Sequence, residues 1–328
     1  MKVNQRYRPG ILPQFCIVLA ALILAVYIPA GHAVKPGEVY LSAEITAGLR
    51  AVANMDSDEK IRNPDYLAKK FLTPDFWFLG FLSKDYQKSK SFIKFYRMNY
   101  YYTINANTWH IDTVLQKIAS QNLKQVVNIG AGFDSRPYRF GKQMPDVRFF
   151  EVDQPATQNL KKKMVKAEFG ELPANVTYIP IEYRTHAIFD ALKLAGYDEN
   201  LKTLFIWEGS TQYTDSKVAD QTMRDIASHS GTGSEIVFDY LPEGFVTGDY
   251  DRYPRAWYVA VRTDASGEPL KFGIAEGQAD EFVTQRGFKV ISDLGGAELA
   301  PKYLTRSDGA IDGKPVANVR IMHAVVKR

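Results

Sequence analysis

Cysteine is almost absent from this chain of 328 residues, because Cys16 is the only one. A single cysteine excludes an intrachain disulfide. The sequence also has no cysteine pair and no H-x-x-x-H spacing, so it lacks the short patterns that hold zinc. No motif in the sequence therefore indicates a metal site.

An excess of charge of one sign is also missing. Forty-one Lys and Arg against 37 Asp and Glu give a formal net charge of +4. Lys2, Arg6 and Arg8 supply +3 of this charge, and no acid precedes residue 34, which leaves +1 for the remainder. Nucleic-acid-binding proteins usually carry a basic patch or stripe. We therefore expect no nucleic acid as a partner.

A hydrophobic run of full membrane-spanning length is lacking too. The apolar run at residues 15–28 has 14 residues, whereas a spanning helix needs about 20. Pro13 and Gln14 interrupt its extension back to residue 11. A basic start precedes the run, and Gly31 and Ala33 follow it at the spacing that a signal peptidase accepts. We expect residues 1–33 to be a signal peptide or a membrane anchor, with membrane association through residues 11–28.

The most informative pattern is a glycine-rich turn followed by an acid. An apolar strand leads into Gly130-Ala131-Gly132, and a second apolar strand ends at Asp153, 21 positions after Gly132. Glycine allows a sharp turn and a close approach of ligand to backbone. An ionised carboxylate at a strand end can accept hydrogen bonds from ribose hydroxyls. The pattern predicts a nucleoside site; the alternatives are a plain strand–helix connection and, for Asp153, an N-cap of the helix that begins at Pro155.

The third glycine of the dinucleotide fingerprint G-x-G-x-x-G is replaced by Ser135. A pyrophosphate would lose part of its cradle at this position. A nucleoside without phosphates, such as S-adenosylmethionine, needs only the turn and the acid. Ser135 therefore disfavours a nicotinamide-dependent reductase.

Three blocks of sequence carry a more specific resemblance. Residues 128–136 (N-I-G-A-G-F-D-S-R), 150–155 (F-E-V-D-Q-P) and 206–213 (I-W-E-G-S-T-Q-Y) resemble the N-L-G-A-G-x-D-[ST]-R, F-E-V-D-x-P and A-E-G-x-x-x-Y segments of the leucine carboxyl methyltransferase-like family. Residues 272–290 are similar to a late stretch of that family. The resemblance covers about residues 40–328 and implies a class I S-adenosylmethionine-dependent methyltransferase, whose relatives methylate carboxylates or hydroxyls.

The resemblance also implies which residues bind the cofactor S-adenosyl-L-methionine. They are Gly130, Ala131, Gly132, Asp153, Glu182, Tyr183 and Glu208. Glu208 follows a buried strand, where an unpaired carboxylate is costly. A cationic part of the cofactor would be its partner, and the alternative is a structural hydrogen bond to the following loop.

Three other residues of these blocks are expected to lie near the site without binding the cofactor. Asp134 and Arg136 resemble an ion pair of the family, for which a structural role beside the turn is expected. Tyr213 is a candidate for the wall of the acceptor pocket or for the core.

One segment departs from the family pattern. Where the family has an arginine that pairs with the cofactor's carboxylate, this chain has Asn105-Ala106-Asn107-Thr108. Asparagine donates hydrogen bonds but carries no charge, and losing a charge-assisted bond typically costs about 1.5–3 kcal/mol. Arg97 is a candidate substitute from a neighbouring turn.

From residue 123 the chain alternates short apolar strands with helical segments, as parallel α/β sheets do. Strands are predicted at residues 125–129, 148–152, 176–180, 203–207, 235–240, 289–293 and 317–326. Helices are predicted at residues 155–168, 189–194, 216–229 and 278–286, the third capped by Thr214 or Asp215. Together with the resemblance this predicts an α/β fold: a Rossmann-like seven-stranded, mostly parallel sheet with helices on both faces, its last strand antiparallel.

The predicted organisation has an N-terminal segment and two parts. Residues 34–122 form a helical cap, with helices at residues 41–55, 64–72 and 109–118, and residues 123–328 form the methyltransferase core with an insert at residues 241–277.

The expected function is methyl transfer to a carboxylate or hydroxyl of a small molecule or a protein C-terminus. A carboxylate needs no base; for a hydroxyl only His110 and His186 are candidates by position. Because the cofactor is made in the cytosol, an export-like segment creates a conflict. The conflict is resolved if the cofactor reaches the outer compartment or if the segment is an anchor with a cytoplasm-facing domain. The alternative is an exported, non-catalytic binding protein with a degenerate pocket.

Overall fold

The computed structural model of the protein describes residues 38–73, 85–95, 99–184 and 188–327. The predicted signal or anchor segment, Arg97 and His186 lie outside the described residues. Within the described ranges, no helix combines the length and apolar character that a membrane span requires.

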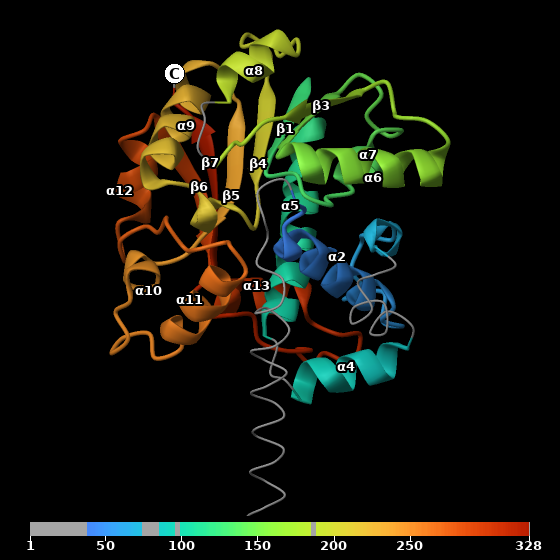
Figure 1. The fold of residues 1–328 in the computed structure, drawn as a ribbon, viewed down its shortest axis with the longest axis vertical. Helices are drawn as coiled ribbons and strands as arrows, with labels where there is room; N and C mark the ends of the chain where they lie inside the picture. The colour runs from blue at the N-terminus through green and yellow to red at the C-terminus, as the bar shows by residue number, and fades with distance from the viewer. Residues whose placement is uncertain (1–37, 74–84, 96–98, 185–187, 328) are drawn as a thin grey trace, which may run out of the picture.

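One sheet of seven strands organises the described part of the chain (Figure 1). The strands are β1 (Gln125–Ile129), β2 (Arg148–Asp153), β3 (Val176–Pro180), β4 (Thr203–Trp207), β5 (Glu235–Tyr240), β6 (Phe288–Leu294) and β7 (Arg320–Val326). Their order is β3-β2-β1-β4-β5-β7-β6, and β7 runs antiparallel to both of its neighbours while β1 to β5 are parallel. The predicted α/β fold with an antiparallel last strand is confirmed.

Helices cover both faces of the sheet because alternate side chains of each strand enter two different cores. Val126 belongs to one core and Val127 to the other. The first core includes side chains of α5 (Tyr100–Ala119), α7 (Pro155–Phe169) and α13 (Gly296–Tyr303). The second includes side chains of α8 (Phe189–Leu194), α9 (Ser216–Ser228) and α12 (Ala279–Thr284). Asp215 caps α9 by accepting from the backbone N–H of Lys217.

The remaining elements precede, connect or follow the strands. They are α2 (Leu41–Asn54), η1 (Ala68–Phe71), α4 (Tyr86–Phe95), α6 (Arg136–Phe140), η2 (Thr211–Tyr213), α10 (Glu243–Thr247) and α11 (Ala256–Ala265). Side chains of α2, η1 and α4 join the same core as α5. The insert holds α10 and α11, which share a small core of their own around Leu241, Phe245 and Ala256.

Two predicted helices of the cap differ from the structure. The helix expected at residues 64–72 is only the short η1, because Asn63 and Asp65 accept hydrogen bonds from the backbone two residues ahead, which competes with a helix. The helix expected at residues 109–118 begins at Tyr100. Most of α5 is buried on all sides, so its first turns have no amphipathic pattern to mark them.

Candidate active site

The residues assigned to the cofactor come together at the carboxyl edge of the parallel strands. The glycine turn follows β1, Asp153 ends β2, Glu182 and Tyr183 follow β3, and Glu208 follows β4. The strand order reverses between β1 and β4, so this edge contains the switch point at which such sheets bind ligands.

The glycine turn has no room for a side chain at Gly130. Gly130 and Gly132 have φ values of +68° and +42°. A Cβ on Gly130 would lie 2.3 Å from Ser210 Oγ and 2.7 Å from the Tyr183 hydroxyl oxygen. Ala131, between the glycines, is buried. Glycine is therefore required at Gly130 by its backbone conformation and by the packing of Ser210 and Tyr183, and Gly132 adds a second position without a side chain.

Gly130→Ala is expected to destabilise the fold more than Gly170→Ala. Gly170 ends α7 with φ +82° and has nothing within 4 Å of its Cβ position, so it measures the conformational cost alone. That cost is about 1–2 kcal/mol, and the contacts with Ser210 and Tyr183 add to it at Gly130. Urea unfolding of both variants measures the difference. Equal losses in the free energy of unfolding would mean that Ser210 and Tyr183 can move to make room for the new methyl group.

Asp153 locks the glycine turn. Its Oδ2 accepts from the Gly132 N–H at 2.6 Å and its Oδ1 from the Gln154 N–H at 2.7 Å. Burial raises the pKa of Asp153 to about 6, and the two hydrogen bonds oppose the shift. The N-cap residue of α7 is Gln154, without a capping side-chain bond, so the structure gives no support to the N-cap alternative for Asp153. Each carboxylate oxygen keeps a further lone pair for a ribose hydroxyl.

Arg136 is the centre of a buried ion network behind the turn. Its guanidinium bonds to Asp112 at 2.8 Å, to Asp134 at 2.6 Å and to Glu208 at 2.9 Å. Burial works against ionisation of Asp134, but Arg136 holds the pKa of that carboxyl below its usual range. The expected Asp134–Arg136 pair is confirmed. Glu208 is oriented by Arg136 rather than by the loop that follows it.

Arg184 lies between aromatic rings above the same edge. Its guanidinium carbon is 3.9 Å from the ring centre of Tyr40 and 5.0 Å from that of Tyr213, and its Nε donates to the Tyr183 hydroxyl at 3.2 Å. Its Nη2 bonds to Glu268 of the insert at 3.1 Å. Cation–π contacts and a buried ion pair therefore hold Tyr183 against the turn.

Glu268 also joins the insert to the start of the cap. It accepts from the backbone N–H of Ser42 at 3.3 Å and from the Ser42 hydroxyl at 2.8 Å. Glu268 is buried. The insert and the first turn of α2 thus meet beside the carboxyl edge, which brings together segments that are 226 residues apart.

A second carboxylate stands next to Glu208. Asp239, near the end of β5, is buried and accepts from the Gly209 N–H at 2.7 Å. Burial, and then the charge of Glu208, raise the pKa of Asp239 to about 7. Burial and the neighbouring Tyr213, Asp239 and Glu208 likewise raise the pKa of Tyr100. The charges of these carboxyls and phenols therefore act on one another near the carboxyl ends of β4 and β5.

The asparagines in place of the family arginine are part of the cap. Asn105 accepts from the Asn63 side chain at 2.8 Å and donates to the Ile61 carbonyl at 3.1 Å. Asn107 is buried, and its Oδ1 has no hydrogen-bond partner within the described ranges. This unsatisfied acceptor is compatible with a bound donor such as an ammonium group.

His110 packs in the core rather than at the site. Its Nδ1 lies 3.0 Å from the Tyr303 hydroxyl of α13, and burial lowers the pKa of His110 to about 4. A proton acceptor for the reaction is better sought among the carboxylates.

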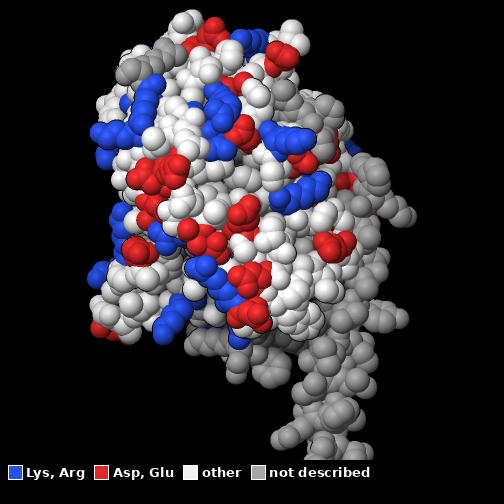
Figure 2. Space-filling model, turned by 90° about the vertical axis from the view of Figure 1, so that its left-hand side faces the viewer, with Lys and Arg blue, Asp and Glu red and all other residues white. Residues whose placement is uncertain are grey.

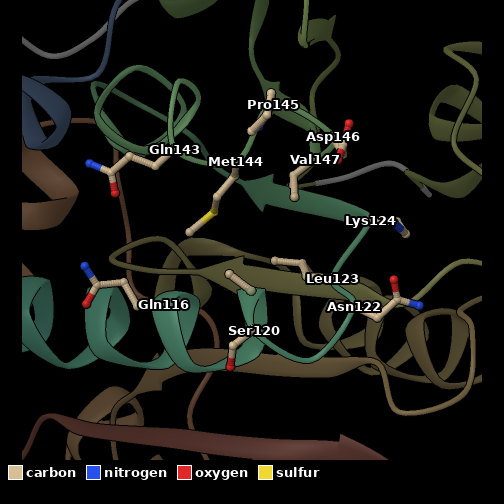
Figure 3. Close-up of a pocket in the computed structure, with 11 residues that line it drawn as sticks. Gln116, Ser120, Asn122, Leu123, Lys124, Gln143, Met144, Pro145, Asp146 and Val147 are labelled. Atoms are coloured by element: carbon tan, nitrogen blue, oxygen red, sulfur yellow. The ribbon is translucent and has the colours of Figure 1, made fainter.

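A cavity of about 500 Å³ opens at the opposite edge of the sheet (Figure 3). It is lined by Gln116 of α5, by Ser120 and Leu123 between α5 and β1, and by Met144 and Val147 before β2. These residues mark the amino ends of the strands, whereas open α/β sheets bind ligands beyond the carboxyl ends. We do not assign the cofactor to this cavity.

The strand order, the glycine turn after β1 and the acid at the end of β2 define a class I S-adenosylmethionine-dependent methyltransferase. The model of the family described as "Leucine carboxyl methyltransferase" matches residues 43–227, more than half of the chain. The chain belongs to this family, and S-adenosylmethionine is its cofactor.

Similar curated proteins are described as putative S-adenosyl-L-methionine-dependent methyltransferases. "Putative S-adenosyl-L-methionine-dependent methyltransferase YktD" of Bacillus subtilis (strain 168) is 26% identical over 222 residues, which are 68% of this chain and 72% of that protein. Its counterpart SCO7813 of Streptomyces coelicolor is 27% identical over 62% of this chain and 69% of that one. A solved O-methyltransferase family protein from Burkholderia thailandensis aligns over 69% of this chain and 60% of that one, with 9% identity and a TM-score of 0.42. None of these names identifies the compound that receives the methyl group.

Proposed function

We propose that this methyltransferase methylates a hydroxyl oxygen of a small aromatic acceptor and that Asp239 accepts the hydroxyl proton. The observation that carries the proposal is the group of acids and phenols around Asp239, which accepts from the Gly209 N–H directly after Glu208 at 2.7 Å and whose charge, with that of Glu208, acts on Tyr100. It lies beside the strands that carry the cofactor residues.

The cofactor would be held by the residues of β1 to β4. Gly130, Ala131 and Gly132 offer backbone to the amino-acid part, Asp153 accepts from the ribose, and Glu182 and Tyr183 lie at the next strand end. When bound, S-adenosylmethionine supplies a methyl group activated by a positively charged sulfur. The negative charge of Glu208, fixed by Arg136, suits such a cation.

The charges around Asp239 favour a hydroxyl over a carboxylate as acceptor. Arg136 is shared among three acids, and Arg184 is paired with Glu268. A carboxylate acceptor would add a negative charge next to Glu208 and Asp239, and like charges at short range are costly in a buried site. A phenol or alcohol arrives neutral and can stack against Tyr100 or Tyr213.

Asp239 suits proton removal. A general base works best when its pKa lies near the working pH, and the pKa of Asp239 is about 7. While the acceptor oxygen takes the methyl group and the carbon–sulfur bond breaks with its electron pair left on sulfur, the Asp239 carboxylate would take the hydroxyl proton. The other residues position the acceptor and exclude water.

The test pairs cofactor binding with product analysis. S-adenosylmethionine is titrated into the purified full-length protein by calorimetry, with NADH as the control. The protein is then offered methyl-labelled cofactor and aromatic acceptors in matched pairs, a phenol and a carboxylic acid on the same ring. We expect base-stable methyl ethers. Base-labile methyl esters alone would show a carboxylate acceptor, and no binding at millimolar cofactor would refute a working site.

We also propose that residues 1–33 place the protein at a membrane or export it. The support is the basic start, the apolar run and the small residues after it. N-terminal sequencing of the mature protein from intact cells tests whether the segment is cleaved.

A further inference from the structure

The insert exposes a concentration of large hydrophobic side chains. Among the described residues, ten such side chains are exposed, and four of them lie between residues 250 and 261. They are Tyr250, Trp257, Tyr258 and Val261. Single exposed hydrophobics need no explanation, but a cluster on one element marks a contact surface.

Three of these side chains lie on one side of α11. Val261 follows Tyr258 by three residues and Trp257 by four, so it lies between them around the helix, and the three span an arc of about 100°. Their exposed fractions are 53%, 37% and 59%. Ala256 and Val259 instead belong to the small core of the insert. The helix is thus packed on one side and presents an aromatic, apolar face on the other.

The residue types of this aromatic face are those that proteins place at membrane–water interfaces. Trp and Tyr are enriched where bilayers meet water, because their rings are apolar and their polar atoms remain hydrated. Arg262 lies over the Tyr258 ring, 5.5 Å from its centre, and is exposed. A long cationic side chain at the rim of such a face can reach the headgroups while its stem covers apolar surface.

The chain connects this face to the apolar N-terminal run. Ser42 is hydrogen-bonded to Glu268, which follows the end of α11 by three residues. Twelve residues separate the end of the apolar run at residue 28 from residue 40, and a fully extended chain of that length spans about 40 Å. α11 itself is only about 15 Å long. A membrane that holds the run is therefore within reach of α11.

The charge of the insert gives no reason to expect a strongly charged partner at the exposed face of α11. The insert at residues 241–277 contains six acids and four bases. Figure 2 shows Lys, Arg, Asp and Glu interspersed over the side of the molecule that it presents, without a field of one sign. A surface of this kind favours an apolar partner over a polyanion.

We propose that the exposed face of α11, formed by Trp257, Tyr258 and Val261, docks on the surface of a lipid bilayer. Helices of this type bury their apolar face about 5–10 Å into the boundary between headgroups and acyl chains. The docked orientation would place the insert, and with it the Glu268 side of the site, next to the membrane. The proposal is independent of the acceptor chemistry.

Spin labels at two positions of the full-length chain test the proposal. Cys16 is the only cysteine, so Cys16→Ser combined with Val261→Cys gives one labelled site. Cys16→Ser with Leu194→Cys is the matched control, because Leu194 is 91% exposed and ends α8, at the other end of the molecule in Figure 1. Each protein is mixed with phosphatidylcholine vesicles, and the collision rates of the label with oxygen and with a water-soluble nickel complex report its depth.

The expected result is a label at position 261 about 5–10 Å inside the headgroup boundary, with the label at position 194 in water. High salt should leave both depths unchanged. The proposal is overturned if the protein does not bind vesicles, or if it binds and both labels remain in water. Dipolar broadening between labels at position 261, without burial in lipid, would overturn it in favour of a second copy of the chain as the partner.

Discussion

Asp153→Ala is expected to weaken S-adenosylmethionine binding by roughly 10²–10⁴-fold while the protein remains folded. Hydrogen bonds to charged groups are worth about 1.5–3 kcal/mol each, and two bonds to ribose hydroxyls would be lost. The same change removes the acceptor of the 2.6 Å hydrogen bond from the Gly132 N–H, so the glycine turn is also held less firmly. Calorimetric titration measures the affinity, and circular dichroism verifies the fold.

The affinity of the unaltered protein should depend on pH through the same carboxyl. The pKa of Asp153 is raised to about 6 in the absence of ligand, and ribose hydroxyls require the ionised form as acceptor. Binding should therefore strengthen as the pH rises through 6, by about tenfold between pH 5 and pH 7. Asp153→Asn should bind weakly and without this dependence.

Asp215→Ala is the matched control for Asp153→Ala. Asp215 is a true N-cap, since it accepts from the Lys217 N–H at 3.0 Å. Its replacement should cost about 1 kcal/mol of stability and leave cofactor affinity unchanged. If Asp153→Ala behaved like Asp215→Ala, with a loss of stability but normal affinity, the ribose assignment would be wrong.

The parallel core could be predicted from sequence because its strands are buried on both faces. Runs such as residues 125–129 and 203–207 are mostly apolar and buried at every position, and both match the strands observed. The cap was harder to predict. Tyr100 begins α5 among aromatic residues with no helical pattern, and Asp65 is drawn into contacts with Arg50 and Ser135 that lie far away in the sequence.

The residues of the candidate site likewise fall into those that the sequence could indicate and those that it could not. The glycine turn and Asp153 lie within one strand–helix–strand unit, so their spacing already indicates a site. Asp239 could have been found by the same rule, because it too lies near the carboxyl end of an apolar strand. Glu268 had no such signal. It comes from the insert, and only the folded chain brings it to Arg184 and Ser42.

Asp239→Asn is expected to lower kcat for a hydroxyl acceptor by about 10²–10⁴-fold, the usual contribution of a general base. The amide keeps the size of the side chain and an oxygen for the Gly209 N–H, but it cannot take a proton. Cofactor affinity should stay within about twofold of normal, since the ribose and the glycine turn are untouched. Rapid-quench single-turnover assays with labelled cofactor separate the two effects.

The pH profile distinguishes a base from a merely structural carboxyl. Because the pKa of Asp239 is about 7, kcat/KM should rise with pH up to about 7 and then level off, as expected when the ionised carboxylate is the active form. The Asn variant should lose this rise. Asp293→Asn serves as the control, since Asp293 near the end of β6 bonds to Tyr240 and Arg320 and should leave the profile unchanged. Methyl transfer at normal rates by Asp239→Asn would instead point to an acceptor that needs no base, which is the behaviour of a carboxylate.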